Sequence, residues 1–327
     1  MQNKKQIINL VSRFLILLIL CVVMSFLRPD AFLTANNLRQ VLLEQAPFTI
    51  LISFGMSLCI ISHGIDISLS STMVLSAYLS ANAFLNGKYF LGALIAIAVG
   101  GGFGALNGIL ISKIKVPAFI ATYSVDFIAL GLAYVICDGK YIYGFPDSFR
   151  ALVTGELIPG LPNIALVTIV VFVILYVLTR FTNYGRGFYS IGHNATATKL
   201  SGIKADGIVC SVYIIGGLLA ALTGVLYLAR LNSADPSIRG TLTMDSLAAS
   251  LIGGIPFSGG TGTLANTIAG AFIIVVIRNG MNILNVPTTW NQVVVGVVIV
   301  FSLFYEAFMD KMFVRLAAKN KTKEQAA

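Results

Sequence analysis

Apolar runs alternate with short polar breaks along the whole chain, and this pattern predicts a membrane protein built from helices. The runs are about 15–24 residues long, enough for a helix to cross a hydrocarbon core of about 30 Å. A membrane barrel would instead show strands of about 10 residues with alternating apolar and polar side chains. We therefore predict an all-α, polytopic fold with about ten transmembrane helices, at residues 14–27, 47–62, 67–84, 91–112, 117–136, 164–178, 208–231, 244–255, 264–284 and 292–308.

The pattern also predicts a single transmembrane domain over residues 1–327, because no polar stretch exceeds about 30 residues. The basic, then apolar N-terminus lacks a small-residue cleavage site and continues too long for a signal peptide, which favours a retained first helix. Segment 244–255 is short for a full span, which leaves open a re-entrant helix or a break at Gly253 and Gly254.

Charge positions predict the orientation of the helices. Only 11% of the residues are charged, against about 25% in soluble domains. The net charge of +9 does not indicate nucleic-acid binding, because in a membrane protein the position of the charges matters more than their sum. If both termini are cytoplasmic, the inner segments hold about 14 of the 22 Lys and Arg residues. We therefore expect both termini and residues 180–207 on the cytoplasmic side.

The longest polar stretch of the back half, residues 180–207, predicts a short capped helix. Asn194 is a favourable N-cap, and Gly202 suits the left-handed residue that follows a helix ending near Leu200. The stretch is basic, with a single acid, Asp206. Two interpretations stay open: a loop held inside by its charge, or a docking surface for another protein.

The sequence offers little catalytic chemistry. Residues 259–263 are rich in glycine but lack the Gly-Lys-Ser/Thr of a phosphate-binding loop. The two histidines and four cysteines form no metal-ligand pattern, so we expect no metal and no cofactor. An intramembrane enzyme is a weak alternative, and we predict a protein that is not an enzyme.

Polar residues inside the predicted spans are the candidates for a solute route, since buried ionisable groups in membranes are usually functional. Asp126 is the only acid clearly within a predicted span; it is either hydrogen-bonded to a neighbour such as Tyr123 or Ser124, or faces a route for a hydroxylated solute. Asp66 and Asp245 open helices, where their charge favours the helix dipole. Asn107 and Asn282 are expected to form hydrogen bonds between helices. Both are kept as route candidates, together with Asp126 and Tyr123. Arg278 is expected to extend toward the outer surface.

Small residues one turn apart predict close helix packing. Gly100, Gly104 and Gly108 form one such stripe, and Gly216, Ala220 and Gly224 form another. A nucleotide-binding role for these glycines is disfavoured, because no strand precedes them.

Two motifs stand out: H-G-I-D-I-S at residues 63–68, and the segment at residues 191–203, which begins I-G-H-N-A-T. They resemble the G-I-D-L-S signature and the G-G-N-x-x-A-x-x-L-S-G-I segment of one family, the ribose/galactose/xylose/arabinose-type permeases of bacterial ABC importers. Residues 229–231, 244–249, 253–262 and 278–284 resemble further family segments in the same order. His193 stands where the family has its second glycine, and Asp126 where the family mostly has apolar residues.

The resemblance implies a permease subunit in the bacterial plasma (inner) membrane that imports a monosaccharide by alternating access. Its implied partners are a cytoplasmic ABC ATPase, a periplasmic or lipoprotein sugar-binding protein, and a second permease subunit, identical or not. An ion- or proton-coupled secondary transporter is the alternative, favoured by Asp126 and the interrupted helices. The resemblance assigns ATPase coupling to Gly192, His193, Asn194, Ala195, Thr196, Ala197, Thr198, Lys199, Leu200, Ser201, Gly202 and Ile203.

Overall fold

The computed structural model describes residues 2–287, 289–301 and 304, and these residues are almost entirely helical. The first half contains α1 (Gln2–Leu27), α2 (Pro29–Phe32), α3 (Ala35–Arg39), the π-helix η1 (Gln40–Gln45), α4 (Ala46–Ile61), α5 (Leu69–Leu85), α6 (Tyr89–Ser112), α7 (Ala118–Cys137), β1 (Ile142–Tyr143) and α8 (Asp147–Thr154). The second half contains α9 (Asn163–Phe181), α10 (Asn183–Leu200), α11 (Ala205–Leu231), β2 (Ser233–Ala234), the 3-10 turn η2 (Pro236–Arg239), α12 (Leu242–Ile252), α13 (Leu264–Ile283) and a last helix, Trp290–Phe301.

Each of the ten predicted apolar segments contains a helix, which confirms the all-α class. In the described part of the chain, six helices are long and apolar enough to cross a membrane: Ala35–Ile61, Tyr89–Ser112, Ala118–Cys137, Asn163–Phe181, Ala205–Leu231 and Leu264–Ile283. Four apolar helices are shorter: Arg13–Leu27, Leu69–Leu85, Leu242–Ile252 and Trp290–Phe301. The number of ten spans therefore stays a prediction, and the end of the last predicted helix and the basic tail lie outside the described residues.

Three polar segments contain more helix than the sequence predicts. Residues 32–44, expected as an interfacial stretch, form α3 and a π-helical segment that continues directly into α4. The expected loop 137–163 contains α8, whose Phe149 and Val153 are buried. The residues before Asn194 are also helical, because Thr182 caps α10 by accepting the backbone N–H of Gly185 at 2.9 Å.

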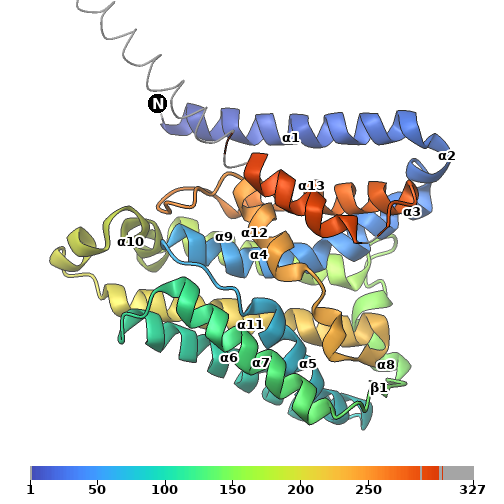
Figure 1. Ribbon diagram of the computed structural model, residues 1–327, viewed down its shortest axis with the longest axis horizontal. Helices are drawn as coiled ribbons and strands as arrows, with labels where there is room; N and C mark the ends of the chain where they lie inside the picture. The colour runs from blue at the N-terminus through green and yellow to red at the C-terminus, as the bar shows by residue number, and fades with distance from the viewer. Residues whose placement is uncertain (1, 288, 302–303, 305–327) are drawn as a thin grey trace, which may run out of the picture.

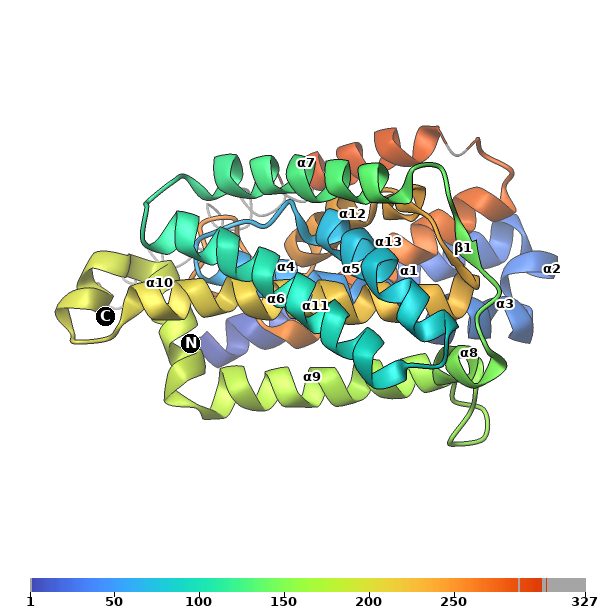
Figure 2. The same cartoon turned by 90° about the horizontal axis from the view of Figure 1, so that it is seen from below.

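The helices lie roughly along one direction, so the bundle has two distinct ends (Figure 1). One end carries α10 and the start of α1, and we call it the α10 end. The opposite end carries α2, α3, β1 and α8, and we call it the α8 end. Figure 2 shows α7 and α9 at opposite edges of the bundle, with α4, α6 and α11 between them.

Helix α4 lies at the centre of the bundle, and all sixteen of its residues are buried. It carries hydroxyl groups into this apolar environment, where they bond to other helices. The Ser57 hydroxyl lies 2.9 Å from Oγ of Ser250 in α12 and 2.8 Å from Oγ1 of Thr267 in α13. Three helices distant in the sequence are thus joined by hydroxyl bonds, as expected where lipid supplies no hydrophobic attraction between helices.

The predicted glycine stripe of α6 packs directly on α11. A Cβ atom on Gly104 would lie only 2.8 Å from Cα of Ile214, so only glycine allows this approach of the two backbones. The second predicted stripe divides between partners: Gly216 faces Gly55 of α4, and Gly224 faces the backbone of Met73 in α5. The predicted packing role of both stripes is therefore confirmed.

Candidate functional site

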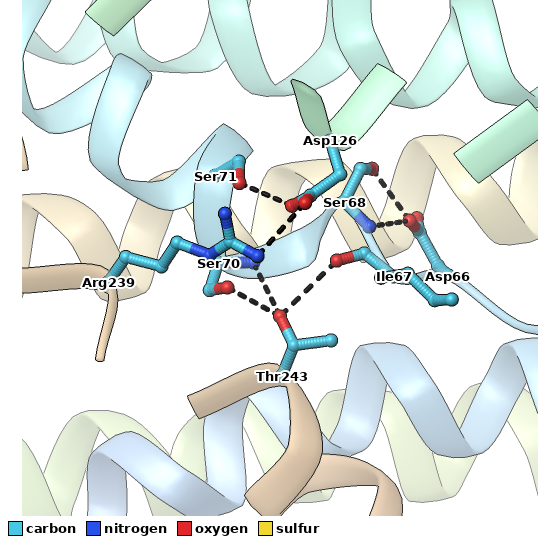
Figure 3. Close-up of polar contacts among 8 residues, drawn as sticks. All are labelled: Asp66, Ile67, Ser68, Ser70, Ser71, Asp126, Arg239 and Thr243. Carbon is cyan, nitrogen blue, oxygen red and sulfur yellow. Dashed lines mark hydrogen bonds and ion pairs between the residues drawn. The ribbon is translucent and has the colours of Figure 1, made fainter. Parts of the chain in front are cut away.

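Two helices begin inside the bundle, and a polar cluster lies where their N-termini meet. Leu69, the first residue of α5, packs beside Gly55 and Gly216, near the middles of α4 and α11. The next residue, Ser70, donates its backbone N–H to Oγ1 of Thr243 in α12 at 3.3 Å (Figure 3). Thr243 also donates to the carbonyl of Ile67 at 3.3 Å. Both helices therefore direct their free backbone N–H groups into the interior of the bundle.

Asp126 of α7 is paired with Arg239, the last residue of the turn η2. Nη2 of Arg239 lies 2.9 Å from Oδ2 of Asp126, and Ser71 donates its hydroxyl to Oδ1 (Figure 3). The Asp126 side chain is 1% exposed, whereas that of Arg239 is 28% exposed. The carboxylate is thus fully enclosed, while its cation approaches from a more open side.

Asp66 lies in the segment between α4 and α5 and holds the turn that precedes α5. Its Oδ1 accepts the backbone N–H of Ser68 at 2.9 Å and the Ser68 hydroxyl at 2.6 Å. Asn107 of α6 donates to the same hydroxyl at 2.8 Å, which confirms its expected interhelical bond. Within the described residues, the other amide atom of Asn107, Oδ1, is buried without a hydrogen-bond partner. This acceptor is available to a donor that enters the bundle.

A third buried carboxylate, Asp245, corrects the prediction for Arg278. Arg278 does not extend toward the outer surface, because its Nη2 lies 2.6 Å from Oδ1 of Asp245. Thr241 donates to the other carboxylate oxygen at 3.1 Å. Asp66 and Asp245 are buried as well, so Asp126 is one of three buried acids among the described residues. Buried charges require such partners, because an unpaired charge at low dielectric costs several kcal/mol or more.

Two route candidates lie away from this cluster. Tyr123 is exposed and stacks on Phe119 with 5.5 Å between ring centroids, so the neighbour of Asp126 is Ser71 rather than Tyr123. Asn282 is also exposed. The interhelical amide contact of α13 is made one turn earlier, where Asn279 donates to Oδ1 of Asn37 at 2.8 Å.

The predicted cytoplasmic helix forms with the predicted caps. Asn194 adopts extended backbone angles inside α10, where it divides the helix at a kink, and its Oδ1 accepts the backbone N–H of Ala197 at 2.9 Å. Gly202 follows the helix in the left-handed conformation, at φ +81°. Of the residues between the caps, Thr198 is buried, while Leu200 is 85% exposed. A rigid helix with an exposed apolar tip thus lies at the α10 end.

The base of this helix carries a small charge network. The Asp206 carboxylate lies 2.8 Å from Nζ of Lys199 and 2.6 Å from Nζ of Lys115. The hydrogen bond from Lys199 to Asp206 raises the pKa of the Lys199 ammonium above its usual value. The network joins the exposed helix to α11 and to the segment after α6.

The remaining part of the predicted coupling stretch packs into the loop between α12 and α13. The backbone N–H of Gly260 in that loop bonds to the carbonyl of Ile61 at 2.8 Å. His63 places Nδ1 2.8 Å from the carbonyl oxygen of Ser258. His193 lies directly over Gly260, as a Cβ atom there would overlap its imidazole ring.

The cluster around Asp126 is suited to binding hydroxyl groups. Among the described residues, no group of three His, Cys, Asp or Glu side chains could hold a metal ion. Carboxylate, guanidinium, amide and hydroxyl groups supply both donors and acceptors, which a polyhydroxylated solute requires. Arg239 and Thr243 were not among the predicted site residues. The one signal in the sequence that could have indicated this place is the group of four hydroxyl residues Ser68, Ser70, Ser71 and Thr72.

Comparison with known proteins gives one consistent result. The family model described as "Branched-chain amino acid transport system / permease component" matches residues 39–303. The D-allose transport system permease protein AlsC of Escherichia coli (strain K12) is 35% identical over 300 residues, 91% of each chain. The ribose import permease protein RbsC of Bacillus subtilis (strain 168) is 36% identical over 298 residues, which cover 90% of this chain and 91% of that one. RbsC of Escherichia coli (strain K12) is 33% identical over 295 residues. No solved structure matches significantly.

Proposed function

Since this chain belongs to the family described as branched-chain amino acid transport system / permease component, we propose that it is the membrane permease subunit of an ABC importer for a monosaccharide. The observation that carries the proposal is the identity of 33–36% to ribose and D-allose permeases along about nine-tenths of the chain. Ribose is a pentose and allose a hexose, so the substrate is a pentose or a hexose. The protein is not an enzyme, and it lies in the inner membrane.

The transport system of this family includes an ATPase and a substrate-binding protein, which supply energy and substrate. The permease then works by alternating access, without chemistry on the sugar. A second permease subunit, identical or different, would complete the route. Residues 1–327 would form one transmembrane domain, with ten spans and both termini in the cytoplasm.

The proposed orientation places the α10 end in the cytoplasm. Lys113, Arg180, Arg186, Lys199 and Lys204 lie in or beside the segments that reach this end, as the positive-inside rule requires.

Residues 192–203 are the proposed ATPase-coupling segment. Their support is the exposed, capped helix at the α10 end and the apolar tip at Leu200, which is suited to a groove on a partner. Because the helix is capped at both ends and anchored through Asp206, a push on its tip would move it as a unit.

Asp126 and Asn107 are proposed to border the sugar route, Asp126 through its partly exposed partner Arg239 and Asn107 through its buried Oδ1, which lacks a partner among the described residues. Tyr123 and Asn282 are candidates on sequence grounds alone. Asp126 and Asp245 each lie in an ion pair with an arginine. The alternative of a proton-coupled carrier is decided by the uptake experiment below.

The test is uptake of radiolabelled ribose and allose by vesicles that contain this permease, its ATPase and its binding protein. We expect uptake that requires ATP and the binding protein, and that persists with a protonophore. Uptake that survives ATP depletion but collapses with the protonophore would establish the secondary carrier instead. Asp126→Asn should lower uptake about 10-fold or more, since hydrogen bonds to a charged group contribute about 1.5–3 kcal/mol; unchanged uptake at every pH would remove Asp126 from the route.

A further inference from the structure

The kink of α10 makes a backbone contact with the loop between α12 and α13. A Cβ atom on Gly192 would overlap the carbonyl oxygen of Ile61 and the backbone of Gly260. Gly260 has φ +76°, and a Cβ atom there would overlap the imidazole of His193. Because both glycines lack a side chain, the His193 ring can lie flush against the loop. The kink and the loop are therefore in direct contact, with no side chain of the loop between them.

The same loop also holds the end of α4. Gly260 donates its N–H to the carbonyl of Ile61 at 2.8 Å, and His63 binds the carbonyl of Ser258 at 2.8 Å. His63 is itself in the left-handed conformation, at φ +63°. Three segments, the kink of α10, the end of α4 and residues 256–263, thus form one junction at the α10 end.

Two connections run from this junction to the polar cluster inside the bundle. One is the interrupted segment 62–68, which leads from the end of α4 to the start of α5. The other is α12, which leads from the loop back to Thr243. They meet again where Ser70 bonds to Thr243, and Arg239, the partner of Asp126, lies four residues before Thr243. The junction and the polar cluster are therefore connected twice, once through segment 62–68 and once through α12.

We propose that His193 is the positioning residue that transmits movement of the helix 194–200 to these two connections, segment 62–68 and α12. The ring lies between the rigid helix and the loop, so a displacement of the helix presses the loop and, through α12 and segment 62–68, moves the Ser70–Thr243 contact. Close-packed segments transmit such a displacement. The family that the sequence resembles has glycine at this position, so the His193 ring is a contact particular to this chain. This inference rests on the proposed ATPase coupling and assigns a residue to it.

The first experiment removes the ring. His193→Gly should still assemble with the ATPase and hydrolyse ATP, because the His193 ring faces the loop at Gly260, whereas the proposed ATPase contact is the exposed tip at Leu200. The number of sugar molecules imported per ATP should fall roughly 2- to 30-fold, the range for residues that modulate coupling between sites. A purely structural role would lower the amount of assembled complex and leave that ratio unchanged. An unchanged ratio in an assembled complex would overturn the proposal.

A double-mutant cycle tests the contact itself. Gly260→Ala introduces a clash with the ring in addition to the strain of a side chain at positive φ. His193→Gly removes only the clash, so the double variant should import more sugar per ATP than Gly260→Ala alone. If Gly260→Ala blocks assembly, restoration of assembly by His193→Gly is the readout. No restoration of either property would contradict the proposal.

Gly259 provides the matched control. It has the same φ of +76°, but a Cβ atom there would approach the carbonyl of Ile60 and the backbone of His63 rather than His193. His193→Gly should therefore not relieve the defect of Gly259→Ala, and equal relief at both glycines would show a general loosening of the loop. If unmodified vesicles lack ATP-driven uptake, the proposed function fails. If they have it and His193→Gly keeps the normal ratio, only this inference fails.

Discussion

Arg239 reaches from η2 to place Nη2 2.9 Å from Oδ2 of Asp126, and this ion pair joins α7 to the segment that leads into α12. The two partners differ in exposure, since the aspartate is enclosed and the arginine is 28% exposed. Removal of the cation leaves an enclosed carboxylate whose remaining hydrogen-bond partner among the described residues is Ser71. The pair therefore fixes the start of α12 relative to α7.

Loss of Arg239 should destabilise the fold strongly. Removal of one partner of a buried pair costs about 3–5 kcal/mol, and partial exposure of Arg239 favours the lower end. We expect Arg239→Met to lower the midpoint of thermal unfolding in detergent, and Asp126→Leu with Arg239→Met to recover much of the loss. The matched control is Arg150→Met, whose exposed pair with Asp147 at 3.5 Å should contribute little. A double variant as unstable as Arg239→Met alone would contradict the assignment.

Glutamate at the exposed tip of the helix 194–200 should weaken ATPase binding. Leu200 is 85% exposed, so Leu200→Glu leaves the fold intact but places a charge in the proposed apolar contact. Burial of a leucine contributes about 1.5–3 kcal/mol, which predicts at least about a 10-fold loss of affinity in co-purification. The control is Leu157→Glu, at the α8 end and 78% exposed, which should bind the ATPase normally. Normal binding and transport by Leu200→Glu would exclude this tip as the contact.

A methyl group added at Gly104 or at Gly102 should change the stability of the protein in opposite directions. Gly104→Ala places Cβ against the α11 backbone, forcing the helices apart, and overpacking of this kind costs about 1–3 kcal/mol. Gly102→Ala has no atom within 4 Å of the new Cβ and should stabilise the helix by about 0.5–1 kcal/mol. Opposite shifts of the thermal midpoint are expected. Equal shifts of the same sign would show that the α6–α11 contact is not close.

Acid should release the loop that follows α8. The carboxylate of Glu156 accepts the backbone N–H of Gly160 at 2.8 Å and pairs with Arg39, and both interactions lower the pKa of the carboxyl. Because the pKa is lowered, the stabilisation of the loop by these two interactions is complete above the ordinary glutamate pKa of about 4.3. It is lost as the pH falls through the pKa of Glu156 in the folded protein.

Hydrogen exchange of single amides measures this loss. After correction for intrinsic rates, the protection of the Gly160 amide should fall below about pH 4. The amide of Leu157 is an internal control, since it bonds to the non-titrating amide of Asn163 at 2.9 Å. Glu156→Gln should remove the pH dependence at Gly160, and a dependence that remains would assign it to another group.

Local features of this fold follow from the sequence. The caps at Asn194 and Gly202 could be predicted because capping depends on a few neighbouring residues. The apolar segments and the stripe at Gly100, Gly104 and Gly108 follow from helical periodicity in the same way. Each of these features requires only the local chain conformation to be known.

Pairings between distant residues did not follow from the sequence. Asp126 and Arg239 are 113 positions apart, and nothing in either neighbourhood names the other. The sequence predicts Arg278 at the outer surface, whereas in the structure Asp245 of α12 holds it inside the bundle. Nothing near Arg278 in the sequence indicates where α12 begins. Such pairs form only when interrupted helices place their ends within the bundle, which periodicity alone does not indicate.

The enclosure of α4 also has a consequence for how the protein is made. Ser57 inserts into the membrane early in synthesis, but its hydrogen-bond partners Ser250 and Thr267 follow about 200 residues later, after most of the chain. Until α12 and α13 arrive, this hydroxyl and the small residues around it face lipid or provisional neighbours. Helix α4 therefore reaches its final environment only near the end of translation, and truncated chains would present its unfilled surface to membrane quality control.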